Sequence, residues 1–328
     1  MSKRKSIRNV VFLVLILVLV LVMIFSGLRI LESTVLFDEQ SRGDDVSSKT
    51  VIRDGVEYFP RQDMTVVLFI GIDQEGKAVP SPSYNNPGAA DVVSLVIFDE
   101  TNKTCSVLCL NRDTMLKMPV LGLGGKPAGS NYGQLALSHT YGTGMEDSCE
   151  NVKNTVSDFL MGVRIDYYVS MRMDAIGIVN DTVGGVTVTV KDDFSAVDPA
   201  ITKGEFTLKG DQAMTFVRSR KDLGNQLNVS RMERQQEYIN GFMKALSAKL
   251  VESDSFALTA YQDVEEYIVT DCSVNALTNL VDKFSDYSIK EIVSPKGENV
   301  RGEKYYEFHV DKEALEDLVI RLLYAPKK

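Results

Sequence analysis

Four ionisable residues stand at the ends of short apolar runs, where carboxylates and a guanidinium group could meet. They are Asp73 after the run 65–72, Asp91 before the run 92–98, and Arg112 with Asp113 after the run 105–110. Short apolar runs bounded by turn residues are typical of buried strands. If the second and third strands form a hairpin, and the first strand lies antiparallel to the second, all four side chains share one edge of a sheet.

Two carboxylates at one edge could hold a metal ion. Mg²⁺ prefers hard oxygen ligands and commonly binds one or two carboxylates together with substrate phosphates. Asp73 and Asp91 are therefore candidate ligands of Mg²⁺, or of Mn²⁺, which favours the same ligand type. The alternative is that both are ordinary aspartates at strand ends and turns.

A second group of candidate residues lies later in the chain and is rich in arginine. Residues 213–219 are expected to form an extended segment or to end in one. Arg218 and Arg220 are two residues apart, so on an extended chain they would point to one side. Guanidinium forks suit phosphate oxygens, so this spacing favours an anion site.

The same anion site would include the start of a helix. Ser230 and Glu233 have the spacing of a capping box, which predicts a helix that begins at Arg231. Arg231 and Arg234 would then lie in its first turn, where free N–H groups bind anions and where Gln235 follows. The alternative is that nearby glutamates and solvent screen these arginines.

The N-terminus differs in composition from the rest of the chain. Four basic residues precede an apolar stretch at 9–28, which is long enough to cross a bilayer and longer than the core of a cleavable signal peptide. We expect a cytoplasmic tail at 1–8, a retained transmembrane signal anchor at 9–28 and a juxtamembrane stalk at 29–60. The basic tail predicts that the N-terminus stays inside and that residues 61–326 lie outside the cytoplasm, at the cell membrane. The alternative is a cleaved signal peptide.

Between residues 60 and 325 the predicted strands and helices alternate, with no break in composition. This favours one α/β domain, a three-layer α-β-α sandwich around a central mixed sheet. Residues 111–133 contain five glycines and two prolines and are expected to form a long loop. The helices after Met145 are apolar enough to serve either as plain core or as the wall of a lipid pocket.

The net charge of −9 argues against a nucleic-acid partner, which normally requires a basic face. Without the basic tail, 32 basic residues remain against 45 acidic ones, a net charge near −13. The arginine-rich candidates therefore form a local basic site on an acidic protein.

In their order along the chain, these segments resemble the LytR–CpsA–Psr family of cell-wall glycopolymer ligases. The resemblance covers about residues 60–325 and follows a single N-terminal span. The matching segments are 71–73, 91–95, 111–114, 165–168, 183–186, 208–213, 218–220, 231–236 and 270–273.

The resemblance implies a membrane-anchored phosphotransferase that moves a glycopolymer, of teichoic-acid or capsule type, from a polyprenyl-pyrophosphate carrier to peptidoglycan. By position, Asp73 and Asp91 correspond to the Mg²⁺ carboxylates. The implied pyrophosphate-binding residues are Arg112, Arg218, Arg220, Arg231 and Gln235. The partners would be the lipid-linked glycopolymer, peptidoglycan and membrane lipid.

The residues leave some alternatives open. The general base could be Asp91 or Asp113, and Asp113 could instead orient Arg112. The protein could also hydrolyse polyprenyl pyrophosphate without a sugar acceptor, or bind wall polymers at the membrane without catalysis. Two carboxylates together with four arginines favour catalysis, because binding alone does not require the full set.

Overall fold

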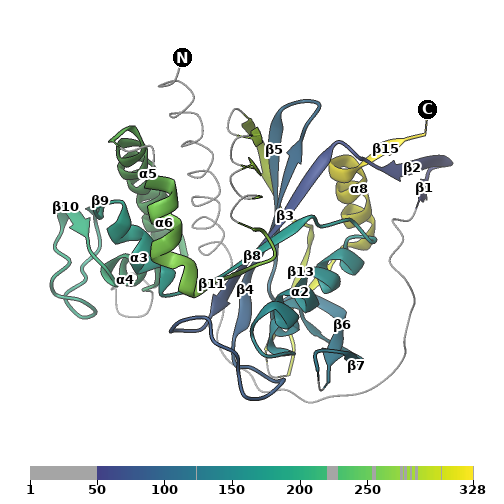
Figure 1. The fold of residues 1–328 in the computed structure, drawn as a ribbon, viewed down its shortest axis with the longest axis horizontal. Coiled ribbons are helices and arrows are strands. Elements are labelled where there is room, and N and C mark those ends of the chain that lie inside the picture. Colours follow the sequence, from purple (N-terminus) through teal and green to yellow (C-terminus); the bar gives the residue numbers. More distant parts are fainter. Residues whose placement is uncertain are drawn as a thin grey trace.

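The computed structural model describes residues 50–327, apart from 123, 220–227, 253–255, 304 and several residues between 274 and 286. Its strands are β1 (Val51–Arg53), β2 (Val56–Pro60), β3 (Met64–Asp73), β4 (Ala89–Asp99), β5 (Thr104–Leu110), β6 (Met115–Leu121), β7 (Pro127–Gln134), β8 (Tyr167–Arg172), β9 (Val186–Val190), β10 (Gly204–Leu208), β11 (Ile268–Thr270), β12 (Ser288–Val293), β13 (Gly297–Arg301), β14 (Tyr306–Val310) and β15 (Tyr324–Pro326). Its helices are η1 (Leu135–Thr140), α2 (Glu146–Phe159), α3 (Ala175–Thr182), α4 (Gln212–Arg218), α5 (Asn228–Glu252), α6 (Phe256–Val264), η2 (Glu265–Tyr267) and α8 (Lys312–Leu323) (Figure 1).

Six strands form the central sheet, in the order β11, β8, β3, β4, β5 and β12. β3 lies antiparallel to β4, and β4 lies antiparallel to β5. β8 runs parallel to β3, and β12 runs parallel to β5, so the sheet is mixed. The expected antiparallel order of the three strands that carry the candidate residues is confirmed.

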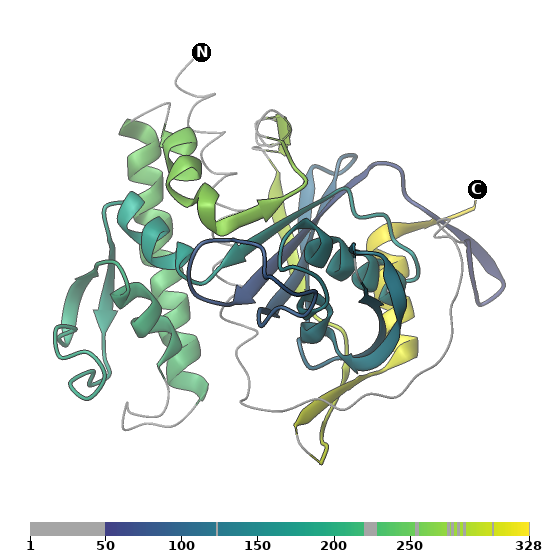
Figure 2. The ribbon, with the colours of Figure 1, turned by 60° about the horizontal axis from the view of Figure 1, so that its bottom comes forward.

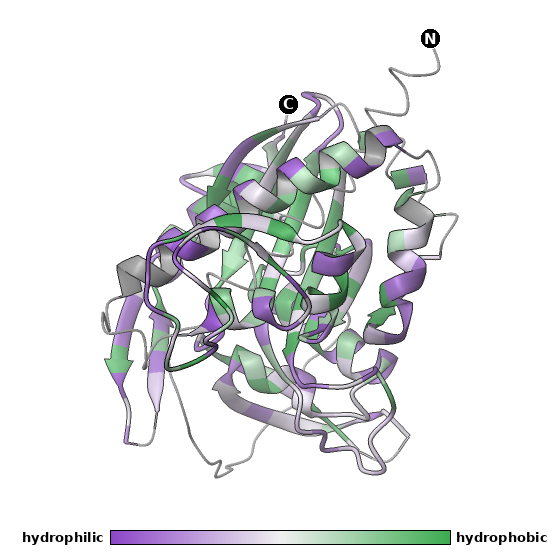
Figure 3. Ribbon diagram, turned by 90° about the vertical axis from the view of Figure 1, so that its left-hand side faces the viewer, coloured by the Kyte–Doolittle hydropathy of each residue, from purple (hydrophilic) through white to green (hydrophobic). Residues whose placement is uncertain are grey.

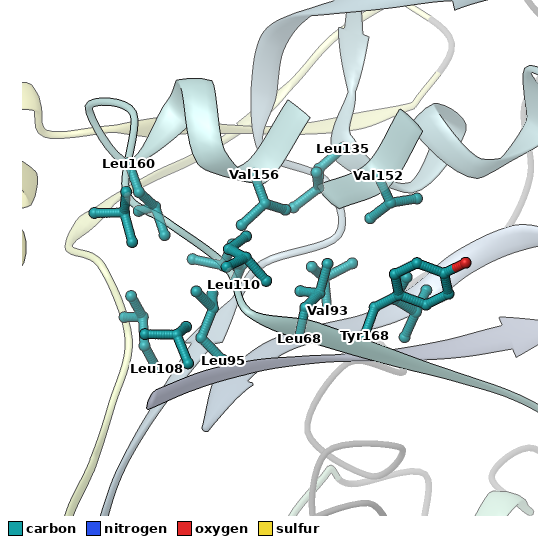
Figure 4. Close-up of a cluster of buried hydrophobic side chains, with 14 of the residues drawn as sticks. Leu68, Val93, Leu95, Leu108, Leu110, Leu135, Val152, Val156, Leu160 and Tyr168 are labelled. Atoms are coloured by element: carbon teal, nitrogen blue, oxygen red, sulfur yellow. The ribbon is translucent and has the colours of Figure 1, made fainter. Parts of the chain in front are cut away.

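Helices cover both faces of this sheet, which explains why β3 is apolar at nearly every position. Val67 and Phe69 pack in a cluster with residues of α3, α4, α5 and α6. Leu68 and Ile70 point to the opposite face and pack in a cluster with residues of η1, α2 and α8 (Figure 4). Because successive side chains of a strand alternate between faces, a strand buried on both sides needs a continuous apolar run.

The views of the ribbon agree with this layered arrangement. Figure 1 places α3, α4, α5 and α6 together, apart from α2 and α8 across the central strands, and Figure 3 shows hydrophobic strands between helices that carry hydrophilic residues. The α/β fold with a central mixed sheet is therefore as expected from the sequence.

The glycine-rich region 111–133 was expected to be a loop, and this expectation is wrong. Residues 115–121 and 127–134 form the antiparallel hairpin β6–β7. Leu116 and Met118 alternate along β6 and, with Leu121 beyond a register shift, are buried in the cluster with α2 and α8. The glycines at the tip, Gly124 and Gly125, have positive φ angles and make the turn, so glycine marked a hairpin here and not a long loop.

Two expectations about the arginine-rich region need correction: of residues 213–219, expected to form or to end in an extended segment, only the C-cap Ser219 is extended, and the predicted helix start is wrong. Residues 212–218 form helix α4, because Ala213, Phe216 and Val217 bury one face with helical spacing. Ser230 lies inside α5, which begins at Asn228, so the expected capping box does not start the helix.

The folded body also includes residues 51–60, which the sequence assigned to a stalk. The hairpin β1–β2 pairs with β15 at the C-terminal end of the described chain. Val51 and Tyr58 pack against the same cluster as α8. The domain therefore begins about ten residues earlier than the boundary expected at residue 61.

The expected anchor at 9–28 lies outside the described residues. Among the helices that the structure describes, none combines the length and apolar character needed to cross a membrane.

Candidate functional site

A β-bulge sets the direction of Asp91. Gly71 pairs with Val92 and Ile72 pairs with Ala90, so Asp91 is the extra residue on β4. Ala90 and Val93 both pack in the cluster with α2 and α8, which regular alternation from 90 to 93 would not allow. Asp91 instead lines a small pocket together with Gly71 and Val92. Such bulges commonly redirect a side chain beside a functional site.

Asp91 is only 3% exposed and pairs with the guanidinium of Arg112. Burial raises the pKa of Asp91 to about 6, the positive charge of Arg112 opposes the rise, and the negative charge of Asp73 adds to it. Removal of a carboxylate from water penalises its charged form. This penalty outweighs the effect of Arg112, so the pKa of Asp91 rises although an arginine lies beside it. Asp73 and Asp91 stand at the same edge of the sheet, one at the end of β3 and the other in the bulge of the neighbouring β4.

Asp113 lies behind Arg112 and is held by the next hairpin. Its carboxylate accepts a hydrogen bond of 2.8 Å from Gln134 Nε2 and lies 3.6 Å from Arg112 Nε. Burial raises the pKa of Asp113 to about 6. The Nε atom of Arg112 is buried and has no hydrogen-bond partner among the described residues. Asp113 is buried, so it contacts Arg112 from the interior of the protein and not from the solvent-exposed side.

Asp73 meets an arginine from the helical layer. Its Oδ1 lies 3.4 Å from Nη2 of Arg218, the last residue of α4. Both side chains are partly exposed, at 39% and 44%, so this pair can be reached from solvent. Two carboxylates from the sheet thus have two arginines beside them, one from the end of β5 and one from α4.

The other predicted arginines fall partly or wholly outside the described residues. Arg220 is not described. Arg231 and Gln235 lie in the first two turns of α5, and their side chains are outside the description. Their spacing of four residues places Arg231 and Gln235 on one face of the helix.

Arg234 has a different role from the one expected. It is 6% exposed, and its guanidinium is bound to protein oxygen atoms of Asp192, Phe216 and Ser219. We expected it among the anion-facing arginines of a first helical turn. It lies instead in the second turn of α5, because the helix begins at Asn228.

Arg172 is a residue that the sequence reasoning missed. It ends β8 beside Ile72, lines the same pocket as Asp91 and is 5% exposed. It donates a long hydrogen bond of 3.4 Å from Nη2 to the carbonyl of Val79, and burial lowers its pKa. The sequence signal for Arg172 is a charged residue at the end of a predicted strand. That signal does not locate Arg172 beside Asp91, because only the pairing of β8 with β3 brings it to this pocket.

The loop 74–90 connects Asp73 to Asp91 and is fixed to the body by buried contacts. The side-chain amide of Asn86 donates to the carbonyls of His139 and Gly142 and to Ser148 Oγ, and its Oδ1 accepts from the Gly88 N–H. In Figure 2 this loop runs in dark blue across the side that faces the viewer. No pattern in the sequence marks Asn86 as the residue that holds the loop.

The far ends of the same two strands provide a comparison. Asp63 precedes β3 and Asp99 ends β4, and Arg61 forms hydrogen bonds of 2.6–3.0 Å with both. Hydrogen bonds from Arg61 and Thr101 lower the pKa of Asp63. Burial raises the pKa of Asp99, but hydrogen bonds from Arg61 and Asn102 outweigh it, so that pKa is also lowered. Raised carboxylate pKa values are found instead at the end with Asp91 and Asp113, as at many functional sites.

The residues present fit Mg²⁺ bound together with a phosphorylated substrate. Among the described residues there is no group of three or more His, Cys, Asp or Glu side chains that could form a protein-only metal cage. Asp73 and Asp91 each use Oδ1 for an arginine, and no described donor bonds to either Oδ2. Two carboxylates with free oxygens are a common Mg²⁺ site when phosphates and waters complete the coordination.

Several relatives of known sequence and structure are similar to this chain. It is 26% identical over 281 residues to the polyisoprenyl-teichoic acid–peptidoglycan teichoic acid transferase TagU of Bacillus subtilis, covering 84% of this chain and 82% of TagU. It is 30% identical over 241 residues to TagV of Bacillus subtilis, a transferase of the same description, covering 71% of this chain and 56% of TagV.

Solved structures share the fold. The protein gbs0355 of Streptococcus agalactiae matches with a TM-score of 0.59 and 23% identity, over 79% of this chain and 86% of that one. TagT bound to LIIa-WTA matches with a TM-score of 0.52 and 22% identity, over 80% of this chain and 90% of that one. Residues 32–322 match the LytR_cpsA_psr family, which extends through the whole described site. The chain belongs to the LytR_cpsA_psr family.

Proposed function

We propose that this protein is a membrane-anchored phosphotransferase. It would move a glycopolymer of teichoic-acid type from a polyprenyl-pyrophosphate carrier to peptidoglycan. The observation that carries the proposal is the meeting of Asp73 and Asp91 with Arg218 and Arg112 at one end of the sheet. The names of the relatives, which are teichoic acid transferases, support the class of substrate.

The arginines would bind the diphosphate of the donor. Arg112 and Arg218 approach the carboxylates from two different elements, and Arg220, Arg231 and Gln235 belong to the segment that continues from α4 into α5. Guanidinium forks bind phosphate oxygens in two places, which fixes the phosphorus for attack. Phosphoryl transfer depends chiefly on such positioning and on stabilisation of negative charge.

Asp73 and Asp91 would hold Mg²⁺, or Mn²⁺ in its place. When bound, the ion would neutralise the charge of the diphosphate, which two carboxylates would otherwise repel. Without an ion, Arg112 neutralises Asp91. The proposal therefore includes a change of partner, in which Arg112 turns from Asp91 toward phosphate oxygens.

The two buried aspartates would have different roles. Asp91 lines the pocket, so it can accept the proton of the acceptor hydroxyl as the new P–O bond forms and polyprenyl phosphate leaves. Asp113 is buried beneath Arg112 and bound to Gln134, so we assign it to the orientation of Arg112.

The apolar segment at 9–28 would anchor the protein in the cell membrane as a single span, with the N-terminus inside. The catalytic domain would then stand outside the cytoplasm, beside a lipid-borne donor and within reach of peptidoglycan. The acidic surface is consistent with the absence of a nucleic-acid partner.

The test uses the full chain in lipid vesicles with a polyprenyl-pyrophosphate-linked teichoic acid, Mg²⁺ and peptidoglycan fragments. Mass spectrometry should detect glycopolymer joined to peptidoglycan through a phosphodiester. Arg218→Gln should lose at least 100-fold in rate, because a charge-assisted contact to the transferring phosphate is removed. Asp91→Asn should lose at least as much, because it removes a metal ligand and the proton acceptor.

A matched control is Arg321→Gln. Arg321 is exposed to a similar degree, 49%, and also pairs with a carboxylate, Glu291, but lies on α8. It should keep the wild-type rate. Release of glycan phosphate without linkage would indicate a hydrolase, and no change in donor or acceptor would indicate a binding protein.

A further inference from the structure

Arg234 is enclosed by two carbonyls at the end of helix α4 and by two side chains from the segment after β9. Its Nε donates a hydrogen bond of 2.9 Å to the carbonyl of Phe216, and its Nη2 donates to the carbonyl of Ser219. Its Nη1 pairs with Asp192, and its guanidinium carbon lies 5.7 Å from the centre of the Phe194 ring. These polar contacts are all to protein groups, and the side chain is 6% exposed.

The two carbonyls are those of residues on either side of Arg218. The last carbonyls of a helix have no N–H donor within that helix, and a cation near them is stabilised by the helix dipole. Arg234 therefore closes the C-terminal end of α4 from the neighbouring helix α5. Arg218 is the last residue of α4, and its side chain lies beside Asp73.

The surroundings of Arg234 are packed and largely buried. The rings of Phe194 and Phe216 stack with their centres 5.6 Å apart. Asp192 holds the opposite edge of the guanidinium and is itself largely buried. A planar guanidinium can serve two carbonyls and a carboxylate at once, whereas an ammonium group is a single point of charge.

We propose that Arg234 is a positioning residue for Arg218: by fixing the C-terminal end of α4, it holds Arg218 at Asp73 and directs it toward the donor pyrophosphate. Binding of pyrophosphate by Arg218 rests on the proposed function, whereas control of the α4 end by Arg234 does not. Arg234 itself does not contact the donor.

The test is a double-mutant cycle on the full chain in detergent, with farnesyl pyrophosphate and Mg²⁺ as the binding probe. Arg234→Lys should weaken binding about tenfold, because the charge remains while the fork is lost. In the Arg218→Gln background the same change should weaken binding less than twofold. An equal loss in both backgrounds would overturn the proposal, since Arg234 would then act independently of Arg218.

A second variant covers the case in which Arg234→Lys does not fold. Asp192→Asn keeps the shape of the side chain but weakens its hold on Arg234. It should lower affinity for the probe by a smaller factor, again only when Arg218 is present. If Asp192→Asn lowers affinity for the probe equally in the wild-type and Arg218→Gln backgrounds, the proposal would also be overturned.

A measurement without any ligand separates this proposal from the proposed function. Hydrogen exchange of the peptide 212–219 should be at least tenfold faster in Arg234→Lys than in wild type. The control is Glu233→Gln on the exposed side of α5, which should leave that exchange unchanged. Unchanged exchange in Arg234→Lys would overturn the positioning role. Faster exchange in Arg234→Lys, combined with no binding of pyrophosphate by the wild-type protein, would support that role and would refute donor binding by Arg218.

Discussion

The guanidinium of Arg112 pairs with the carboxylate of Asp91, although 21 residues separate them in the sequence. The pair joins the end of β5 to the bulge of β4, two strands that lie side by side and antiparallel. Both groups are largely buried, so the charge of each is balanced mainly by the other and not by water.

The first prediction concerns pH. Asp91 and Asp113 have pKa values raised to about 6 in the folded protein, from 3.8. Below their folded pKa the native state binds more protons than the unfolded state, so these two groups make the protein more stable as pH falls from 7 toward 4. The expected gain from Asp91 is on the order of 2–3 kcal/mol.

Urea unfolding at pH 7 and pH 4.5 with EDTA measures this effect. Other carboxylates, such as Asp63, have lowered pKa values and act in the opposite direction, so the comparison must be with a variant. Wild type should gain stability between pH 7 and pH 4.5 as Asp91 takes up a proton, and Asp91→Asn should lack this gain. The difference in stability between the two proteins should therefore favour Asp91→Asn more at pH 7 than at pH 4.5. The exposed Asp317→Asn is the control, and an identical pH dependence in Asp91→Asn and wild type would contradict the prediction.

The second prediction concerns the metal. Mn²⁺ titration followed by electron paramagnetic resonance should show one site in the presence of pyrophosphate. Asp91→Asn or Asp73→Asn should weaken this binding at least tenfold, since each removes one of two charged ligands. Asp63→Asn, at the opposite end of β3, should leave Mn²⁺ binding unchanged while lowering stability, because it breaks an ion pair with Arg61.

The third prediction concerns the support of Asp113. Gln134 Nε2 donates both to Asp113 and to the carbonyl of Tyr306. Gln134→Leu should lower the free energy of unfolding by about 1–3 kcal/mol, because two buried acceptors lose their donor. Chemical denaturation measures this, and Gln62→Ala, whose exposed amide bonds only a local carbonyl, should change stability by less than about 0.5 kcal/mol.

The fourth prediction concerns the loop between the two metal-binding candidates. Asn86→Ala removes three hydrogen bonds to the body and should destabilise the protein by about 2–4 kcal/mol. The freed loop should be cleaved faster by protease within residues 74–90. Ser83→Ala, at an exposed position in the same loop, is the control. Equal cleavage of both variants would show that Asn86 does not hold the loop.

The fifth prediction concerns packing of α5 on β9. A Cβ on Gly241 would lie 2.4 Å from the carbonyl oxygen of Thr187. Replacement of a helical glycine by alanine normally stabilises a helix by about 1 kcal/mol. Gly241→Ala should instead lower the melting temperature, because α5 must move away from β9. Lys244→Ala, on the exposed side of the same helix, should leave it nearly unchanged.

The strand pairing around the site could be predicted because it depends on short-range rules. Buried apolar runs joined by a short turn form an antiparallel hairpin, which places Asp91 near Arg112 without knowledge of the rest of the chain. The glycine-rich hairpin β6–β7 and helix α4 were not predicted. In the hairpin β6–β7, the many turn-forming residues obscure the alternating apolar pattern of the strands. In α4, the apolar positions Ala213, Phe216 and Val217 form a pattern too short to distinguish helix from strand.

The sequence by itself determined the α/β class, the antiparallel relation of β3, β4 and β5, and the family, because apolar periodicity and motif order are properties of the chain alone. Only the tertiary structure decided which charged groups are partners. The bulge that redirects Asp91, the approach of Arg172 along β8 and the enclosure of Arg234 by α4 all depend on contacts between distant segments. Burial then sets the pKa of each group, and burial is known only when the elements have packed.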